Sequence, residues 1–64
     1  MKAILLIDHG SRRAAANEQL RALAERLERS LRQRDDDAIV EHAHMELSAP
    51  DVAAGFARCV ARGA

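Results

Sequence analysis

The chain has 64 residues, and its 10 basic side chains balance its 10 acidic ones. This length allows one domain at most, and a net charge of zero provides neither a basic field for nucleic acid nor a polybasic membrane anchor. With one phenylalanine and no tryptophan or tyrosine, the chain also lacks an aromatic platform on which bases stack.

The first predicted element is a strand over residues 3–7, with the sequence AILLI. A short apolar run without polar interruption is typical of a buried parallel strand. Asp8, His9, Gly10 and Ser11 follow it, and a glycine there lets the backbone turn sharply and leaves room beside the histidine ring. Ligands of open α/β sheets bind at the carboxyl ends of the strands. An imidazole is a side chain that can change protonation near neutral pH or bind a metal as a neutral ligand, so His9 is a candidate active-site residue.

A helix is predicted from Ser11, as its N-cap, to about Arg34. Apolar residues at helical spacing predict its buried stripe: Ala16, Leu20, Leu23, Leu27 and Leu31. Two acid-to-base pairs at i,i+4 spacing indicate a solvated outer face: Glu25 with Arg29, and Glu28 with Arg32. The acidic run at residues 35–37 ends this helix and makes the connection.

Residues 38–47 alternate, which predicts a second strand. One face carries Ile39, Ala43, Met45 and Leu47, and the other carries Val40, His42, His44 and Glu46. A second helix is predicted to begin with Ser48 as its cap and Asp51 as the acid three residues on. Its predicted buried stripe is Val52, Phe56, Cys59 and Val60, and Gly63 is the predicted terminating residue.

The order strand, helix, strand, helix predicts an α/β fold with parallel strands, in which the second helix should lead to a third strand. The sequence stops at Ala64, where that strand would begin. Domains below roughly 70–80 residues seldom gain more than a few kcal/mol from an unaided core. We therefore expect residues 1–64 to be a single partial domain, either a truncated product or a unit completed by a second copy.

Cysteine content and the amino terminus bear on location. A single cysteine makes no internal disulfide and is typical of a reducing compartment. The apolar run after Met1 and Lys2 is too short for a signal-peptide core or a membrane span. We expect a soluble, cytoplasmic protein.

Four stretches together resemble the amino-terminal half of the CbiX/SirB-type sirohydrochlorin chelatases. They are ILLIDHGSR at residues 4–12, ANE at 16–18, AHMELSAP at 43–50 and RGA at 62–64. The resemblance implies the β-α-β-α half of a flavodoxin-like parallel-sheet domain. It also implies a lyase that inserts Co²⁺, Fe²⁺ or Ni²⁺ into sirohydrochlorin, a carboxylate-rich tetrapyrrole, on a cobalamin or sirohaem route. The metal is then a substrate, no organic cofactor is expected, and the partner is a second copy or a missing carboxy-terminal half.

The same resemblance implies roles for individual residues. The family histidine that serves as metal ligand and general base falls on His9, and the family glutamate that contacts the metal falls on Glu46. A second family histidine would lie beyond the last residue of this chain. Most members have glycine before the first histidine, where this chain has Asp8. Substrate carboxylates are expected to bind near the loop at Ser11, Arg12 and Arg13.

These residue types suit metal insertion. Two pyrrole N–H protons must leave as the metal enters, so a base with a near-neutral pKa must lie beside the macrocycle. Imidazole and carboxylate together bind Co²⁺, Ni²⁺ or Fe²⁺ and leave positions open for macrocycle nitrogens. Because parallel strands end at one edge of the sheet, His9 and Glu46 are expected to converge there.

Each role has a structural alternative. His9 is otherwise a strand-end histidine bonded to backbone, Glu46 a solvated strand terminus, and Arg12 and Arg13 surface charges. Three more residues are open between two roles: His42 and His44 between packing and ligation, and Asp8 between a hydrogen-bond partner of His9 and a turn former. Cys59 is expected in the core.

Two other functions remain open. One is a non-catalytic fragment or assembly module of the same fold. The other is phosphoryl transfer like that of the histidine phosphatases, which also place His-Gly after their first strand. There an arginine precedes the histidine, whereas the Asp8 carboxylate of this chain would repel a phosphate.

Overall fold

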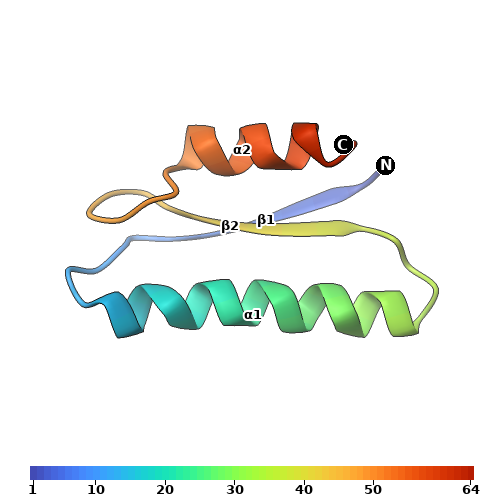
Figure 1. Ribbon diagram of the computed structural model, residues 1–64, viewed down its shortest axis with the longest axis horizontal. Coiled ribbons are helices and arrows are strands. Elements are labelled where there is room, and N and C mark those ends of the chain that lie inside the picture. The colour runs from blue at the N-terminus through green and yellow to red at the C-terminus, as the bar shows by residue number, and fades with distance from the viewer.

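The computed structural model describes all 64 residues and contains two strands and two helices. In chain order they are β1 (Ala3–Asp8), α1 (Ala14–Gln33), β2 (Ile39–His44) and α2 (Val52–Ala61). The two strands are parallel, and the helices cover opposite faces of the sheet, giving three layers (Figure 1). The predicted α/β class and element order are confirmed. Neither helix is long and apolar enough to cross a membrane.

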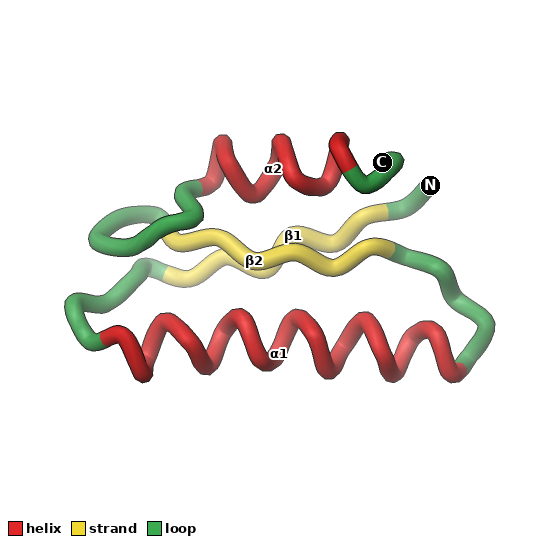
Figure 2. Tube along the Cα trace, in the orientation of Figure 1, coloured by secondary structure: helices red, strands yellow, loops and turns green.

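The two strands lie side by side (Figure 2). Their register runs from Ala3 opposite Ile39 to Asp8 opposite His44. The expected alternation holds within β2: His42 and His44 line a pocket together with residues of α1, whereas Ala43 lies against α2. The strand ends at His44, so the loop begins earlier than predicted. The residues expected at its end, Met45, Glu46 and Leu47, all belong to that loop and are exposed.

The core lies along β2 and not along β1. Ala38, Ile39, Val40 and Ala43 are buried, whereas no residue of β1 is, and the Ile7 side chain in β1 is 47% exposed. The prediction of a buried first strand was therefore wrong. Both helices pack mainly on β2, and the outer edge of β1 has no strand beside it. Strand β1 is therefore only partly covered.

Helix α1 begins later than predicted. Its N-cap is Arg13, and Ser11 Oγ instead accepts the Arg13 N–H at 3.0 Å. Ala24 is buried in this helix, whereas Leu23 is 47% exposed and Ala16 is exposed too, so the assignment of these two residues to the buried stripe was wrong. The rest of the contacting side is half-buried: Leu20, Leu27 and Leu31.

The acidic turn after α1 ends the helix as predicted. Asp35 adopts a left-handed conformation with φ of 59°, and its N–H and that of Asp36 donate to carbonyls of the last helical turn. Asp36 Oδ1 then accepts the Ala38 N–H at 3.0 Å, while its other oxygen pairs with Lys2 Nζ at 3.1 Å. The turn therefore leads directly into β2.

Helix α2 differs from expectation at its start and along its buried face. Its N-cap is Asp51, which accepts the Ala54 N–H at 2.8 Å, so the assignment of Ser48 was wrong. Gly55 and Cys59 are the buried residues of the helix. The other three positions of the predicted stripe are exposed: Val52 by 38%, Phe56 by 65% and Val60 by 52%. Gly63, with φ of 112°, terminates the helix as predicted.

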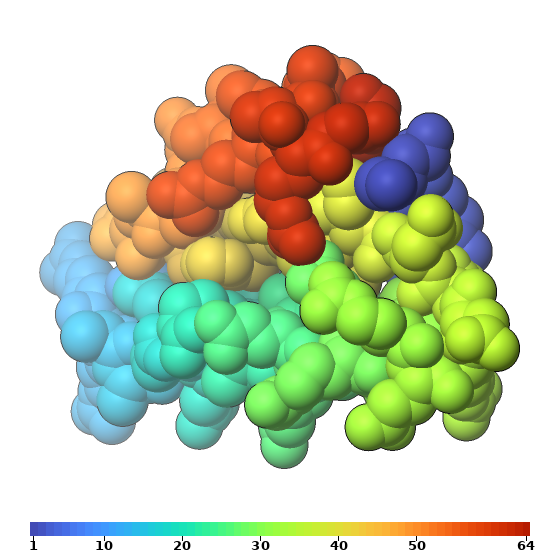
Figure 3. Space-filling model, turned by 45° about the vertical axis from the view of Figure 1, so that its right-hand side comes forward, coloured from blue at the N-terminus to red at the C-terminus, as the bar shows by residue number.

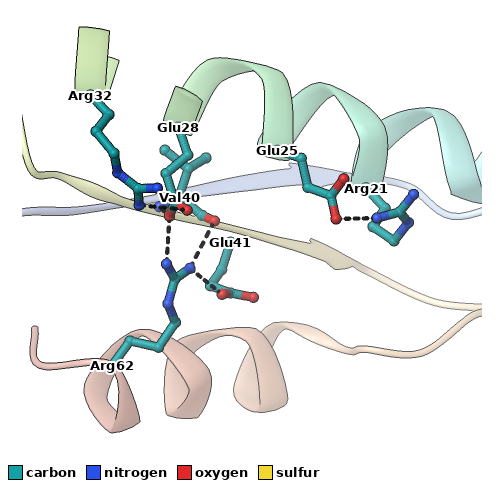
Figure 4. A network of polar contacts seen from close by, with 7 residues as sticks. All are labelled: Arg21, Glu25, Glu28, Arg32, Val40, Glu41 and Arg62. Atoms are coloured by element: carbon teal, nitrogen blue, oxygen red, sulfur yellow. Dashed lines mark hydrogen bonds and ion pairs between the residues drawn. The ribbon is translucent and has the colours of Figure 1, made fainter. Parts of the chain in front are cut away.

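The three layers are linked by one charged cluster, built on Arg62 of the segment after α2 (Figure 4). Arg62 pairs with Glu28 of α1 at 2.8 Å and with Glu41 of β2 at 2.7 Å. Glu28 Oε1 also accepts the Val40 N–H at 2.8 Å, which satisfies a donor of β2 that faces away from β1. In the space-filling view, β2 is visible between the two helices that this cluster joins (Figure 3).

The predicted helix-surface pairs are confirmed in one case. Glu28 lies 3.4 Å from Arg32, as expected, but its side chain is only 16% exposed and bonds to β2, so its assignment to a solvated outer face was wrong. Glu25 pairs with Arg21 instead of Arg29.

Candidate functional site

The carboxyl ends of both strands bring His9 and Glu46 together through their backbones. Beyond the paired strands, the Met45 N–H donates to the Asp8 carbonyl at 2.9 Å, and the Glu46 N–H donates to the His9 carbonyl at 3.1 Å. Both the His9 and the Glu46 side chains are exposed, and no hydrogen bond or ion pair joins them to each other or to the rest of the chain. The imidazole and the carboxylate are free to bind a ligand at this edge.

Gly10 is required by a close approach of the chain to itself. Its φ is +91°, and a Cβ at this position would lie 1.8 Å from the Glu46 carbonyl oxygen. The expectation that Gly10 leaves room for a ligand beside His9 is therefore corrected. That room is filled by the backbone of Glu46, and the glycine is what allows the two segments to approach.

Asp8 connects the turn to β2. Its Oδ1 accepts the Gly10 N–H at 2.9 Å and lies 2.6 Å from His44 Nδ1. Because a carboxylate oxygen only accepts, the Nδ1 of His44 carries the hydrogen of that bond. Of the two roles considered for Asp8, the structure shows a turn former. Its side-chain partner is His44 and not His9.

Asn17 closes the loop on the other side of Gly10. Its Oδ1 accepts the Ser11 N–H at 2.9 Å, and its Nδ2 donates to the Ser11 carbonyl at 2.7 Å. Sequence reasoning noted Asn17 in the resemblance but gave it no role. The available signal was a polar residue three positions before Leu20, on the inward side of the first helical turn.

A cavity of about 340 Å³ lies between the start of α1, the end of β2 and the loop that follows. Ser11 and Arg12 line it, together with Arg21, His42 and His44. Arg13, His9 and Glu46 do not line it. Of the three residues expected to bind substrate, the structure therefore brings two to the same hollow.

The electrostatics of this cavity favour a neutral His42. Burial, followed by the nearby His44, lowers the pKa of the His42 imidazole below its usual value. Arg21 at the cavity carries ion pairs to Glu18 and Glu25, and its hydrogen bond to Glu18 lowers the pKa of that carboxyl. Arg12 is exposed and has no hydrogen-bond or ion-pair partner in the structure. It is the unengaged cation of this cavity.

The chain does not gather three histidine, cysteine, aspartate or glutamate side chains into a cluster able to hold a metal ion. His42 and His44 meet edge to face, with ring centroids 5.7 Å apart. The His44 side chain is 1% exposed and already bonded to Asp8. The structure therefore gives His44 a packing and hydrogen-bonding role.

Comparison with known proteins identifies a family. The CbiX family model matches residues 3–64. The chain belongs to the CbiX family. The sirohydrochlorin ferrochelatase of Arabidopsis thaliana, a chloroplastic protein, is 39% identical over 61 residues, which are 95% of this chain and 25% of that protein. The chain thus spans about a quarter of the length of this curated relative. No solved structure matches significantly.

The CbiX match includes both halves of the candidate site. It contains the turn that bears His9 and the loop that bears Glu46, which the structure joins by a backbone hydrogen bond. This CbiX chain presents one imidazole and one carboxylate at a sheet edge, and three residues after His9 it carries the unengaged guanidinium of Arg12. Such a set can bind a divalent cation, accept a proton and attract a carboxylate.

Proposed function

We propose that this chain forms part of a sirohydrochlorin chelatase centre, in which His9 and Glu46 bind the incoming divalent metal. The observation that carries the proposal is the hydrogen bond from the Glu46 N–H to the His9 carbonyl, which sets the two residues opposite each other at the carboxyl edge. The CbiX match and the similarity to the Arabidopsis sirohydrochlorin ferrochelatase support it. That name makes Fe²⁺ one candidate substrate, beside Co²⁺ and Ni²⁺.

His9 acts as the general base in this proposal. Insertion exchanges two pyrrole N–H protons for one M²⁺, so the overall reaction releases two protons. A neutral imidazole accepts one proton at a time, and the exposure of His9 lets it pass each proton to water. The Glu46 carboxylate offsets the charge of the cation before the macrocycle nitrogens replace its water ligands. An imidazole and a carboxylate leave coordination positions open for those nitrogens.

The carboxylates of the tetrapyrrole bind beside this edge. Arg12 contributes a guanidinium without another partner, and the Asn17 side chain holds the Ser11 backbone at the same cavity. Arg13 is exposed outside the cavity, and we give it a lesser share of substrate binding. The remaining ligands and the rest of the pocket come, in this proposal, from a longer chain or from a second copy.

A non-catalytic role is the second candidate. It is favoured by the absence of a three-residue ligand cluster within this chain. As an assembly module, the chain would present the same sheet edge to other segments without turning substrate over itself.

Metal insertion separates the two candidates. Sirohydrochlorin is mixed with Co²⁺, Fe²⁺ or Ni²⁺ and the chain, and the change in its visible absorption is followed. We expect His9→Ala to lower the insertion rate by about 10²-fold or more, the usual size of a lost general base. Glu46→Ala should raise the metal concentration needed for half-maximal rate while leaving the fold intact.

The matched control is Asp37→Ala, which removes an exposed carboxylate that makes no side-chain hydrogen bond or ion pair. Its insertion rate should equal that of the unmodified chain. Unchanged turnover in His9→Ala would refute the catalytic assignment. A folded wild-type chain that inserts none of the three metals would favour the module.

A further inference from the structure

Asp8 and His44 make the one side-chain hydrogen bond that crosses between β1 and β2. The two residues are register partners at the last position of the paired strands. His9 follows Asp8 directly, and Glu46 lies two residues after His44. The pair is therefore the last side-chain link between the strands before the chain reaches both candidate metal-binding residues.

We propose that Asp8 and His44 are positioning residues that hold the turn bearing His9 and the loop bearing Glu46 in one fixed arrangement. The inference rests on the proposed function of His9 and Glu46. It assigns a role to two residues that neither contact the metal nor line the exposed edge in that proposal.

A continuous path of hydrogen bonds supports this role. On one side, Asp8 Oδ1 accepts the Gly10 N–H at 2.9 Å, which closes the turn around His9. The same oxygen accepts from His44 Nδ1 at 2.6 Å. On the other side, the His44 N–H donates to the Pro50 carbonyl at 2.8 Å, which closes the loop that contains Glu46. One carboxylate oxygen thus joins the two segments.

Burial makes this link sensitive to substitution. The His44 side chain is 1% exposed, whereas that of Asp8 is 40% exposed. A buried ring N–H that loses its acceptor costs free energy until the surrounding loop shifts or opens to water to satisfy it. The side chains of His9 and Glu46 make no hydrogen bond of their own. Their placement therefore follows the backbone that Asp8 and His44 hold.

Amide hydrogen exchange on the metal-free chain tests the positioning by itself. In Asp8→Ala, the amides of Gly10 and Glu46 should exchange about tenfold faster or more, because local opening exposes them. Asp8→Asn keeps an acceptor oxygen at the same place and should restore slow exchange. The Ile39 amide, which donates to the Lys2 carbonyl at the far end of the sheet, serves as the internal reference.

Affinity for Co²⁺ tests the consequence for the site. Partners that orient metal ligands typically contribute about 10- to 100-fold in affinity, so Asp8→Ala should weaken Co²⁺ binding by that factor. Asp8→Asn should bind like the unmodified chain. Asp37→Ala is the matched control, since this exposed carboxylate makes no side-chain hydrogen bond or ion pair.

The outcomes separate the two proposals. Unchanged exchange at Gly10 and Glu46 in Asp8→Ala would overturn the positioning role. Equal acceleration at Ile39 would overturn it too, since that result indicates general destabilisation. Local acceleration with rescue by Asp8→Asn supports positioning, and if His9→Ala then leaves Co²⁺ affinity unchanged, the proposed function fails while the positioning stands.

Discussion

Gly10 adopts φ of +91°, and a Cβ there would lie 1.8 Å from a backbone oxygen of Glu46. A left-handed conformation costs an alanine about 1 kcal/mol, and displacing packed backbone adds about 1–3 kcal/mol. We therefore expect Gly10→Ala to lower the free energy of unfolding by at least about 2 kcal/mol, measured by urea denaturation with circular dichroism.

Gly63 offers the matched control for this substitution. Its φ is +112°, but a Cβ there would meet nothing nearer than Met1 Sδ at 3.8 Å. Gly63→Ala should cost only the conformational part, about 1 kcal/mol. If both substitutions lowered the free energy of unfolding equally, the close approach of Glu46 to Gly10 would add nothing to the cost of Gly10→Ala.

Single residues of the site were only partly predictable. His9 could be proposed as a candidate because an imidazole directly after an apolar strand is visible in the sequence. The bond from Asp8 to His44 was not, because it depends on the strand register, which pairs residues 36 positions apart. Likewise, the filling of the space beside Gly10 depends on where the loop after β2 returns. The local sequence pattern predicts neither the bond from Asp8 to His44 nor the approach of this loop to Gly10.

Helix α2 packs through a glycine. A Cβ on Gly55 would lie 2.9 Å from both Ala43 Cβ and Leu5 Cδ1, and 3.1 Å from the His42 carbonyl. Helix propensity alone favours alanine over glycine by about 1 kcal/mol. At this position the close approach outweighs it, so Gly55→Ala should lower the stability of the chain by about 1–3 kcal/mol. Thermal unfolding measures the difference.

The control is the reverse substitution, alanine to glycine, at an exposed position of the same helix. Ala57→Gly should follow propensity and cost about 1 kcal/mol, since Ala57 is exposed. A higher melting temperature for Gly55→Ala than for the unmodified chain would contradict the packing seen here.

The elements themselves were predicted from the sequence, whereas their buried faces were predicted less well. Signals at the carboxyl ends of the helices, Gly63 and the acidic run 35–37, were confirmed, whereas the N-caps predicted at Ser11 and Ser48 were wrong. The stripe of α2 was misjudged because large apolar residues, such as Phe56, were assumed to face the sheet. The sheet instead accepts the side that carries Gly55, because only a residue without a Cβ permits that approach.

The charged cluster of Glu28, Glu41 and Arg62 connects α1, β2 and the end of α2, so it bears on the stability of the entire chain (Figure 4). The Val40 N–H, followed by the Arg62 guanidinium, holds the pKa of Glu28 below its usual value. A carboxyl whose pKa is lower in the folded state stabilises the fold above its unfolded pKa. That stabilisation disappears as the pH falls through the folded pKa.

We therefore expect the free energy of unfolding to decrease as the pH falls below about 4.3, the ordinary pKa of glutamate. Glu28→Gln should remove part of this pH dependence and destabilise the chain at neutral pH. Chemical denaturation at a series of pH values measures both effects. Glu25→Gln, which affects only an exposed pair, should change stability by less than about 1 kcal/mol. If Glu28→Gln retained the full pH dependence of the unmodified chain, the cluster would not be its source.

The chain as a whole has a small core, with 9 of its 64 residues buried. Ile7 of β1 and Phe56 of α2 remain exposed, and the outer edge of β1 has no strand beside it. The partial domain expected from the order of elements and the size of the chain stays a prediction. Sequence reasoning did not anticipate which apolar side chains stay uncovered, since this follows from how α2 sits on the sheet.

The central claim is that His9 and Glu46 bind a divalent metal together at the carboxyl edge of the sheet. Titration with paramagnetic Co²⁺, followed by nuclear magnetic resonance of the histidine rings and backbone amides, tests it most directly. We predict line broadening centred on the His9 ring and the amides around Glu46, which His9→Ala abolishes and Glu46→Ala weakens. Broadening centred on His42, with the His9 resonances unchanged, would contradict the claim.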